Sequence, residues 1–352
     1  MKKLVLLSLL LVLAASAAFA QEAPAATAIK SVLQRDVKPQ GRNADGSFDA
    51  NPAVPGMSPT TGLPVGTQPY VPILMQIDNN FGALPHWGVL HADIMYELPV
   101  AGGGLTRLTA LFSDRHPSQA GPVRSARLMH ADLREEWDAL FIHFGEQTTE
   151  GSNFQQAVRD YGANKKGLVI DGIGNKYASY FTRTRYHGAP HNVSVDLKGF
   201  FDLMVQGGYQ FPLRPFLFED GVTPAGPDAV KISVIHKENE ATAATYLYDV
   251  NRREYLRFTG KGIYQDLLSP QETLAYANVI VQRTKLAFNR RSSNPLLPEV
   301  VGSGAADIFI GGKYVAGAWS RATAQSRTVF LDAQGKEIVL QPGRTWIVIT
   351  NE

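Results

Sequence analysis

The pattern of apolar residues changes once along the chain, and this change constrains the fold more than any single motif. Between residues 58 and 224, short apolar runs typical of strands alternate with segments whose apolar residues recur every three or four positions, as in amphipathic helices. After Pro224–Pro227 the chain has only short strand-like runs separated by turns such as Gly311–Gly312. We therefore predict an α+β or α/β protein: a layered α/β domain over residues 58–224, followed by a mainly β domain over residues 228–352.

The segments of both domains can be placed individually. In the first domain, strands are expected at residues 71–78, 94–100, 105–112, 140–144 and 168–170, and helices at residues 125–139, 152–161 and 195–205. In the second domain, strands are expected at residues 230–235, 245–249, 255–258, 279–283, 307–310, 314–319, 328–331 and 346–349. The helix at 125–139 has an apolar stripe formed by Ala126, Met129, Leu133, Trp137 and Leu140. Beside this stripe, Arg134 and Asp138 have the spacing of an i,i+4 ion pair.

The first 20 residues have the features of a secretory signal peptide. Lys2 and Lys3 precede an apolar run from Leu4 to Ala15, and Ala18–Ala20 is a small-residue cleavage site. An uncleaved anchor is the alternative, but the apolar run is short for one. Residues 21–57 have no hydrophobic periodicity, so we expect a disordered tether there. The expected location is therefore the periplasm, the cell envelope or the outside of the cell, without a stable membrane anchor after cleavage.

Composition excludes several classes of protein. The 34 basic and 32 acidic residues nearly balance, so nothing indicates binding to nucleic acid. The chain has no cysteine, which excludes disulfides, thiol catalysis, cysteine-based metal sites and a lipid-modified cysteine. A P-loop, a dinucleotide-binding fingerprint, a nucleophile elbow and a zincin motif are also missing, so no cofactor is expected. The sequence does not indicate the oligomeric state.

Two arginines lie where a helix is expected to begin. Arg124 and Arg127 belong to the sequence GPVRSAR, Gly121–Arg127. A helix N-terminus carries partial positive charge and disfavours arginine, but its free N–H groups combined with guanidinium groups form a receptor for phosphate or carboxylate. Ser125 is expected to cap the helix. We expect the two arginines to face either an external anion or an internal carboxylate such as Glu97.

Other charged residues interrupt or end apolar strands. A three-residue hairpin loop would place Glu97 and Arg107 directly opposite each other, either as a salt bridge or as a polar pair in a cleft wall. Asp78 ends a strand, where α/β domains often place ligand-binding groups, although it is also a common turn residue. His143, close to Glu146, is either a hydrogen-bonded core residue or part of a site.

A long aperiodic segment, residues 177–192, is rich in tyrosine, arginine and histidine. Long loops of this kind often bind ligands, so Arg183, His191 and Asn192 are candidates. His187 and His191 are four residues apart, but the glycine and proline between them argue against a helical metal-binding pair. No metal site is expected.

These motifs together resemble the YerB-like family, also known as DUF3048, of exported bacterial proteins. The resemblance runs from about residue 58 to the C-terminus and rests on the stretches SPTTGLP, QIDNN, ADIMYELPVAGGGLTRLTALF, GPVRSAR, EEWDALFIHFG, FTRTR, APHN, YLYD, YLRF, NVIVQ and FLDAQGKEIVLQPGRTWI. It implies two domains and identifies GPVRSAR as a family feature, but it implies no activity. Many members resemble lipoproteins, and this chain departs from them because it has no cysteine.

The sequence thus supports three hypotheses about function. The first is an exported envelope protein that binds an anionic small molecule or envelope precursor in a cleft of the α/β domain, through Arg107, Arg124, Arg127, Arg183, His191 and Asn192. The second is a phosphoryl or glycosyl-phosphate transferase, loosely similar to LytR-CpsA-Psr proteins in the order of Asp93 and the arginines. Its candidate catalytic residues are Asp78, Asp93, Glu97 and His143. The third is a protein-interaction module in which the arginines pair internally.

Overall fold

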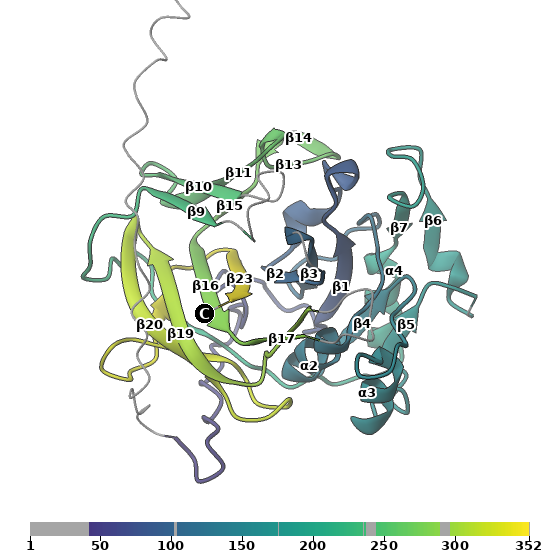
Figure 1. Cartoon of the computed structure of the whole chain (residues 1–352), viewed down its shortest axis with the longest axis horizontal. Helices are drawn as coiled ribbons and strands as arrows, with labels where there is room; N and C mark the ends of the chain where they lie inside the picture. The colour runs from purple at the N-terminus through teal and green to yellow at the C-terminus, as the bar shows by residue number, and fades with distance from the viewer. Residues whose placement is uncertain are drawn as a thin grey trace, which may run out of the picture.

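The computed structural model describes residues 42–101, 104–174, 176–234, 236, 244–288 and 296–351 (Figure 1). The expected signal peptide and much of the expected tether lie outside these residues. Over the described part of the chain, none of the helices combines the length and the apolar character needed to cross a bilayer.

A ten-stranded sheet forms the centre of the molecule. In spatial order its strands are β21 (Val329–Leu331), β20 (Lys313–Arg321), β19 (Gly302–Ile310), β16 (Asn278–Thr284), β23 (Thr345–Asn351), β2 (Ile94–Pro99), β3 (Thr106–Phe112), β1 (Ile73–Asp78), β4 (Leu140–His143) and β5 (Val169–Asp171). Most of their residues are buried, as expected for a sheet covered on both faces.

This sheet joins the two regions that the sequence separates. The parallel pair of β2 and β23, in which Ile94 lies beside Thr345 and Glu97 beside Val348, links the first region to the second. The two regions differ in secondary structure as predicted, because every α-helix among the described residues precedes Pro224. The strands of both regions nevertheless pair in one sheet.

Each face of the sheet packs against its own layer. One face contacts α2 (Leu128–Trp137) and α3 (Phe154–Asp160), and this core includes Met129, Leu133 and Trp137. The other face contacts α4 (Leu197–Gln206) and a second, five-stranded sheet. In Figure 1 the second sheet lies above the large sheet, and α2 and α3 lie below it.

The remaining elements are small. The second sheet consists of β12 (Gly262–Ile263), β11 (Glu254–Thr259), β10 (Ala244–Asp249), β9 (Lys231–Val234) and β15 (Ala275–Tyr276), which pairs with β11. Two-stranded pairs are formed by β13 (Gln265–Asp266) with β14 (Ser269–Thr273), β17 (Leu286–Phe288) with β18 (Leu296–Pro298), β22 (Val339–Leu340) with β8 (Leu217–Phe218), and β6 (Phe181–Arg183) with β7 (Val193–Val195). The 3-10 helices are η1 (Phe81–Ala83), η2 (Val89–His91) and η4 (Ala178–Tyr180).

Candidate functional site

Three neighbouring parallel strands end in titratable residues at one edge of the large sheet. β1, β4 and β5 are mutually parallel neighbours, and their last residues are Asp78, His143 and Asp171. In open α/β sheets, ligands bind outside the carboxyl ends of the strands. This edge is therefore the candidate functional site.

Asp78 is the centre of a group of cations. Its carboxylate is fully buried and lies 3.2 Å from Arg107 Nη1 and 3.2 Å from Arg124 Nε. His191 Nδ1 lies 2.7 Å from Asp78 Oδ2. Arg127 is close enough for its charge to interact with the charges of Asp78, Arg107 and Arg124. We call Asp78, Arg107, Arg124, Arg127 and His191 the Asp78 cluster.

Positive charge is in excess in the Asp78 cluster. Burial raises the pKa of Asp78, but Arg107, the His191 hydrogen bond and Arg124 more than offset this, and the pKa lies below its usual value. Burial and repulsion by Arg107 and Arg124 lower the pKa of Arg127 to about 10. The Asp78 carboxylate thus contacts two guanidinium groups, those of Arg107 and Arg124, and the charge of Arg127 repels both. The buried Nε of Arg107 has no hydrogen-bond partner among the described residues.

Strand pairing places two of these arginines. Arg107 lies directly opposite Asp78 in the antiparallel pair of β1 and β3. The GPVRSAR stretch runs along the end of β1, where Arg124 N donates to Gln76 O at 3.0 Å and Asp78 N donates to Pro122 O at 3.0 Å. These backbone contacts place the Arg124 side chain beside the Asp78 carboxylate.

The helix after GPVRSAR begins later than predicted. α2 starts at Leu128, and Arg127 is its N-cap residue. Arg127 N donates to His130 Nδ1 at 2.8 Å, whereas the Ser125 hydroxyl donates to Phe144 O at 3.3 Å. The expectation that Ser125 caps the helix is wrong, because the backbone at this point is still extended beside β1 and β4.

The β6–β7 hairpin forms the outer border of the Asp78 cluster. It carries the exposed Arg183, which donates to Asn192 Oδ1 at 2.8 Å, next to His191. The Arg183 guanidinium also lies 5.5 Å from the centre of the Phe144 ring. His187 Nε2 lies 2.9 Å from Pro85 O, so His187 and His191 have different partners. The ligand-binding candidates of the sequence therefore gather around one edge.

Glu97 does not belong to the Asp78 cluster. Val100 N donates to Leu105 O and Pro99 pairs with Thr106, which places Glu97 opposite Leu108. Compared with the predicted register this is a shift of one residue, which puts Glu97 and Arg107 on opposite faces of the sheet. The predicted pair of Glu97 with Arg107 is wrong, and so is Glu97 as an internal partner for Arg127.

Glu97 instead binds residues of both regions on its own face. It lies 3.3 Å from Arg257 Nη2, and Thr106 Oγ1 donates to it at 3.1 Å. The Arg257 guanidinium lies 4.2 Å from the centre of the Trp346 ring. The sequence analysis missed Arg257, because nothing local in β11 distinguishes it from a surface arginine.

Asp93 lies at the other edge of the sheet. It precedes β2, which runs in the same direction as β1, and its Oδ2 accepts a hydrogen bond from the Ser113 hydroxyl at 2.9 Å. Burial and the nearby Asp114 raise the pKa of Asp93 to about 8. The structure therefore does not bring Asp93 together with the other catalytic candidates.

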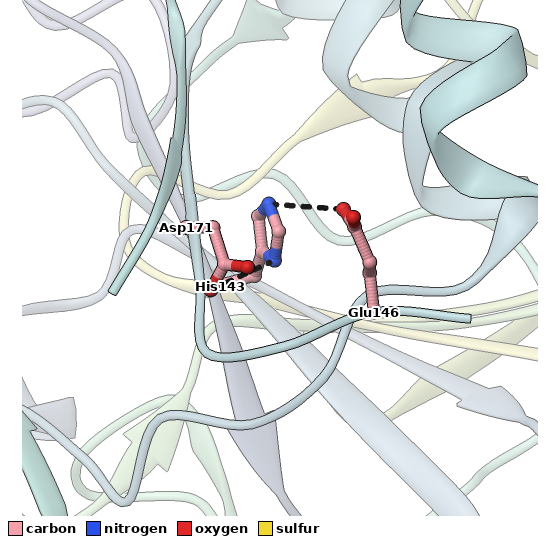
Figure 2. Close-up of side chains that lie close together, drawn as sticks. All are labelled: His143, Glu146 and Asp171. Atoms are coloured by element: carbon pink, nitrogen blue, oxygen red, sulfur yellow. Dashed lines mark ion pairs between the residues drawn. The ribbon is translucent and has the colours of Figure 1, made fainter. Parts of the chain in front are cut away.

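His143 lies between two carboxylates (Figure 2). Its Nε2 is 3.9 Å from Glu146 Oε2, and its Nδ1 is 4.0 Å from Asp171 Oδ1 and 2.8 Å from Gly145 O. Gly145 has a φ of 76°, which turns the chain so that Glu146 lies back over the histidine. Asp171 was missed by the sequence analysis, although it follows a short strand in the same way as Asp78 does.

A large pocket lies elsewhere. It has a volume of about 680 Å³ and lies between residues 52–59 and 213–218. Its lining is mostly apolar and includes Asp114 and Asp220 but neither arginine nor lysine. It therefore lacks the groups that would attract an anion.

Comparisons with known proteins agree on one family. The model for "Protein of unknown function (DUF3048) N-terminal domain" matches residues 60–210, and that for the DUF3048 C-terminal domain matches residues 232–347. "Putative lipoprotein YerB" of Bacillus subtilis is 27% identical over 282 residues, which cover 79% of this chain and 80% of that protein. The crystal structure of YerB from Bacillus subtilis superposes with a TM-score of 0.70 and 25% identity, over 84% of this chain and 97% of that one.

Proposed function

The chain belongs to the DUF3048 family, and we propose that it is an exported cell-envelope protein that binds a phosphate- or carboxylate-bearing ligand at the Asp78 cluster. Two observations support export. The first 20 residues have the pattern of a signal peptide, and the Bacillus subtilis relative is named as a lipoprotein. Because this chain has no cysteine, the proposal is export without a lipid-modified cysteine.

One observation carries the binding proposal: the guanidinium groups of Arg107 and Arg124 both lie 3.2 Å from the single carboxylate of Asp78, and the charge of Arg127 acts on both arginines. Burying a charged group is unfavourable unless opposite charge and hydrogen bonds compensate it. The Asp78 carboxylate already interacts with Arg107, Arg124 and His191. Arg107 Nε has no hydrogen-bond partner among the described residues. An anion bound beside Arg124 supplies the missing charge and acceptors.

The exposed part of the Asp78 cluster indicates where such a ligand enters. The side chains of Arg124 and His191 are 29% and 24% exposed, whereas that of Arg107 is 4% exposed. A ligand therefore reaches Arg124 and His191 first, with Arg183 at the border. Guanidinium groups bind phosphate and carboxylate through paired hydrogen bonds, so both chemistries fit.

The alternative is a phosphoryl or glycosyl-phosphate transferase. Arginines hold the phosphates in such enzymes, and an acid or base acts beside them. His143 and Asp171 lie at the same sheet edge as Asp78, which favours this alternative over a pure interaction module. The binding proposal requires none of these additional groups.

Calorimetric titration tests the proposal with inorganic phosphate, pyrophosphate, a short polyprenyl pyrophosphate and citrate. We expect saturable binding that weakens as salt rises, because screening reduces attraction between charges. Arg124→Gln should weaken binding by at least about tenfold, since hydrogen bonds to charged groups contribute about 1.5–3 kcal/mol. The matched control is Arg252→Gln, an exposed arginine before β11 that should leave affinity unchanged.

Two outcomes would overturn the proposal. One is the absence of saturable binding for every anion in this series. The other is an equal affinity of wild type and Arg124→Gln, which would place binding elsewhere. Turnover of a polyprenyl pyrophosphate would favour the transferase instead.

A further inference from the structure

The buried His143 has a defined tautomer. Only 1% of the side chain is exposed, and Nδ1 lies 2.8 Å from the carbonyl oxygen of Gly145. A carbonyl oxygen only accepts hydrogen bonds, so Nδ1 carries the proton. The lone pair of Nε2 is therefore directed toward Glu146.

Two carboxylates flank the imidazole ring, with Glu146 Oε2 3.9 Å from Nε2 and Asp171 Oδ1 4.0 Å from Nδ1. One ligand atom from each of His143, Glu146 and Asp171 lies within 4.8 Å of the other two. An imidazole nitrogen and two carboxylate oxygens are ligand types that first-row transition metals accept.

Each of the three side chains is held by a second group. Gln155 Nε2 donates a hydrogen bond to Glu146 Oε1, and Oε2 is the oxygen nearest to His143. Asp171 Oδ1 accepts from Gly145 N at 2.8 Å and from Ile173 N at 3.0 Å. Metal-binding histidines typically donate their other N–H to a carbonyl or carboxylate, as His143 does here.

There is room for an ion at this place. A pocket of about 220 Å³ is lined by His143, Glu146 and Asp171, together with residues of α3 such as Phe154 and Arg159. Arg159 is the positive charge nearest to this pocket in α3, and its Nη2 donates to Gln156 Oε1 at 2.8 Å. Its charge also acts on Glu146, so a bound cation would compete with Arg159 for this carboxylate.

We propose that His143, Glu146 and Asp171 bind a divalent metal ion of the Zn²⁺ or Mn²⁺ type. Imidazole favours transition metals over Ca²⁺ and Mg²⁺, and carboxylates accept both Zn²⁺ and Mn²⁺. Ligands about 2.0–2.2 Å from such an ion lie up to about 4.4 Å apart, so small side-chain rotations complete the site. The site lies next to the Asp78 cluster at the same sheet edge, but its ligands are different residues.

The test uses untagged protein that has been treated with EDTA and dialysed. Calorimetric titration with ZnCl₂ and MnCl₂ should show one ion bound per chain, and CaCl₂ should bind at least about tenfold more weakly. Glu146→Gln should weaken Zn²⁺ binding by at least about tenfold, because it removes a ligand oxygen with little change in shape. The matched control is Asp202→Asn, an exposed carboxylate of α4 paired with Lys198, which should leave binding unchanged.

A second measurement uses the wild-type protein, so it does not require any variant to fold. Bound Mn²⁺ is paramagnetic and should broaden the His143 imidazole signals in the NMR spectrum of the wild-type protein before those of His187. No saturable binding of Zn²⁺ or Mn²⁺ below about 1 mM would overturn the proposal, and so would equal affinities of wild type and Glu146→Gln. Arg124→Gln should retain the metal, so this proposal and the anion proposal can fail separately.

Discussion

Asp78 holds several like charges together, and its removal should have a large effect. Asp78→Asn leaves the buried Arg107 without its ion-pair partner. Breaking a buried pair in this way typically costs about 3–5 kcal/mol of unfolding free energy. We expect a loss of this size in urea unfolding, with partial recovery in sulfate, because sulfate replaces the missing negative charge. Unfolding curves that do not respond to sulfate would contradict an anion site at this place.

The carboxyl group of Asp93 should make stability depend on pH. Its pKa is about 8 in the folded chain, well above the value of 3.8 for an unperturbed group. Between these values the folded state holds a proton that the unfolded state has lost, so stability falls as pH rises from about 4 to about 8. Asp93→Asn should remove this part of the dependence. The melting temperatures of both proteins at pH 5 and pH 8 provide the measurement, and parallel curves would contradict the prediction.

Gly121 fixes the position of the GPVRSAR stretch. A Cβ atom there would lie 2.6 Å from the carbonyl oxygen of Val193 and 2.6 Å from the ring of Trp87. Because backbone cannot rotate away, Gly121→Ala should destabilise the protein by about 1–3 kcal/mol and weaken anion binding. The control is Gly188→Ala, where a Cβ would meet nothing within 4 Å. Thermal melting and the phosphate titration measure both effects, and a neutral Gly121→Ala would contradict them.

Local elements were predictable from the sequence, and their pairing was not. The apolar run at residues 105–112 and the three-to-four spacing of Met129, Leu133 and Trp137 are properties of short segments, so β3 and α2 were found. The register of β2 with β3 differs by one residue from the predicted register. This difference places Glu97 opposite Leu108 and therefore on the other face of the sheet from Arg107. Its partner Arg257 lies 160 positions away, where no local pattern connects the two.

Because strands of both regions pair in one sheet, we expect the molecule to unfold as one cooperative unit. Without the second region, β2 would lose β23 and become an edge strand with unpaired backbone groups. We expect a single unfolding transition in calorimetry for the whole chain. A fragment that ends at residue 224 should lack the dispersed NMR spectrum of a folded domain. Two separate transitions, or a folded fragment, would show that the regions are independent.

The place of β23 in the sheet also bears on the order of folding. Thr345 pairs with Ile94, which lies 251 positions earlier in the chain. Closing so long a loop costs chain entropy before any pairing compensates for it, and topologies rich in such distant contacts fold slowly. During synthesis, β2 has no neighbour on this side until residues 345–351 have been made. Under the export proposed above, late pairing of β2 would leave the chain unfolded for longer, which is the form that a narrow translocation channel admits.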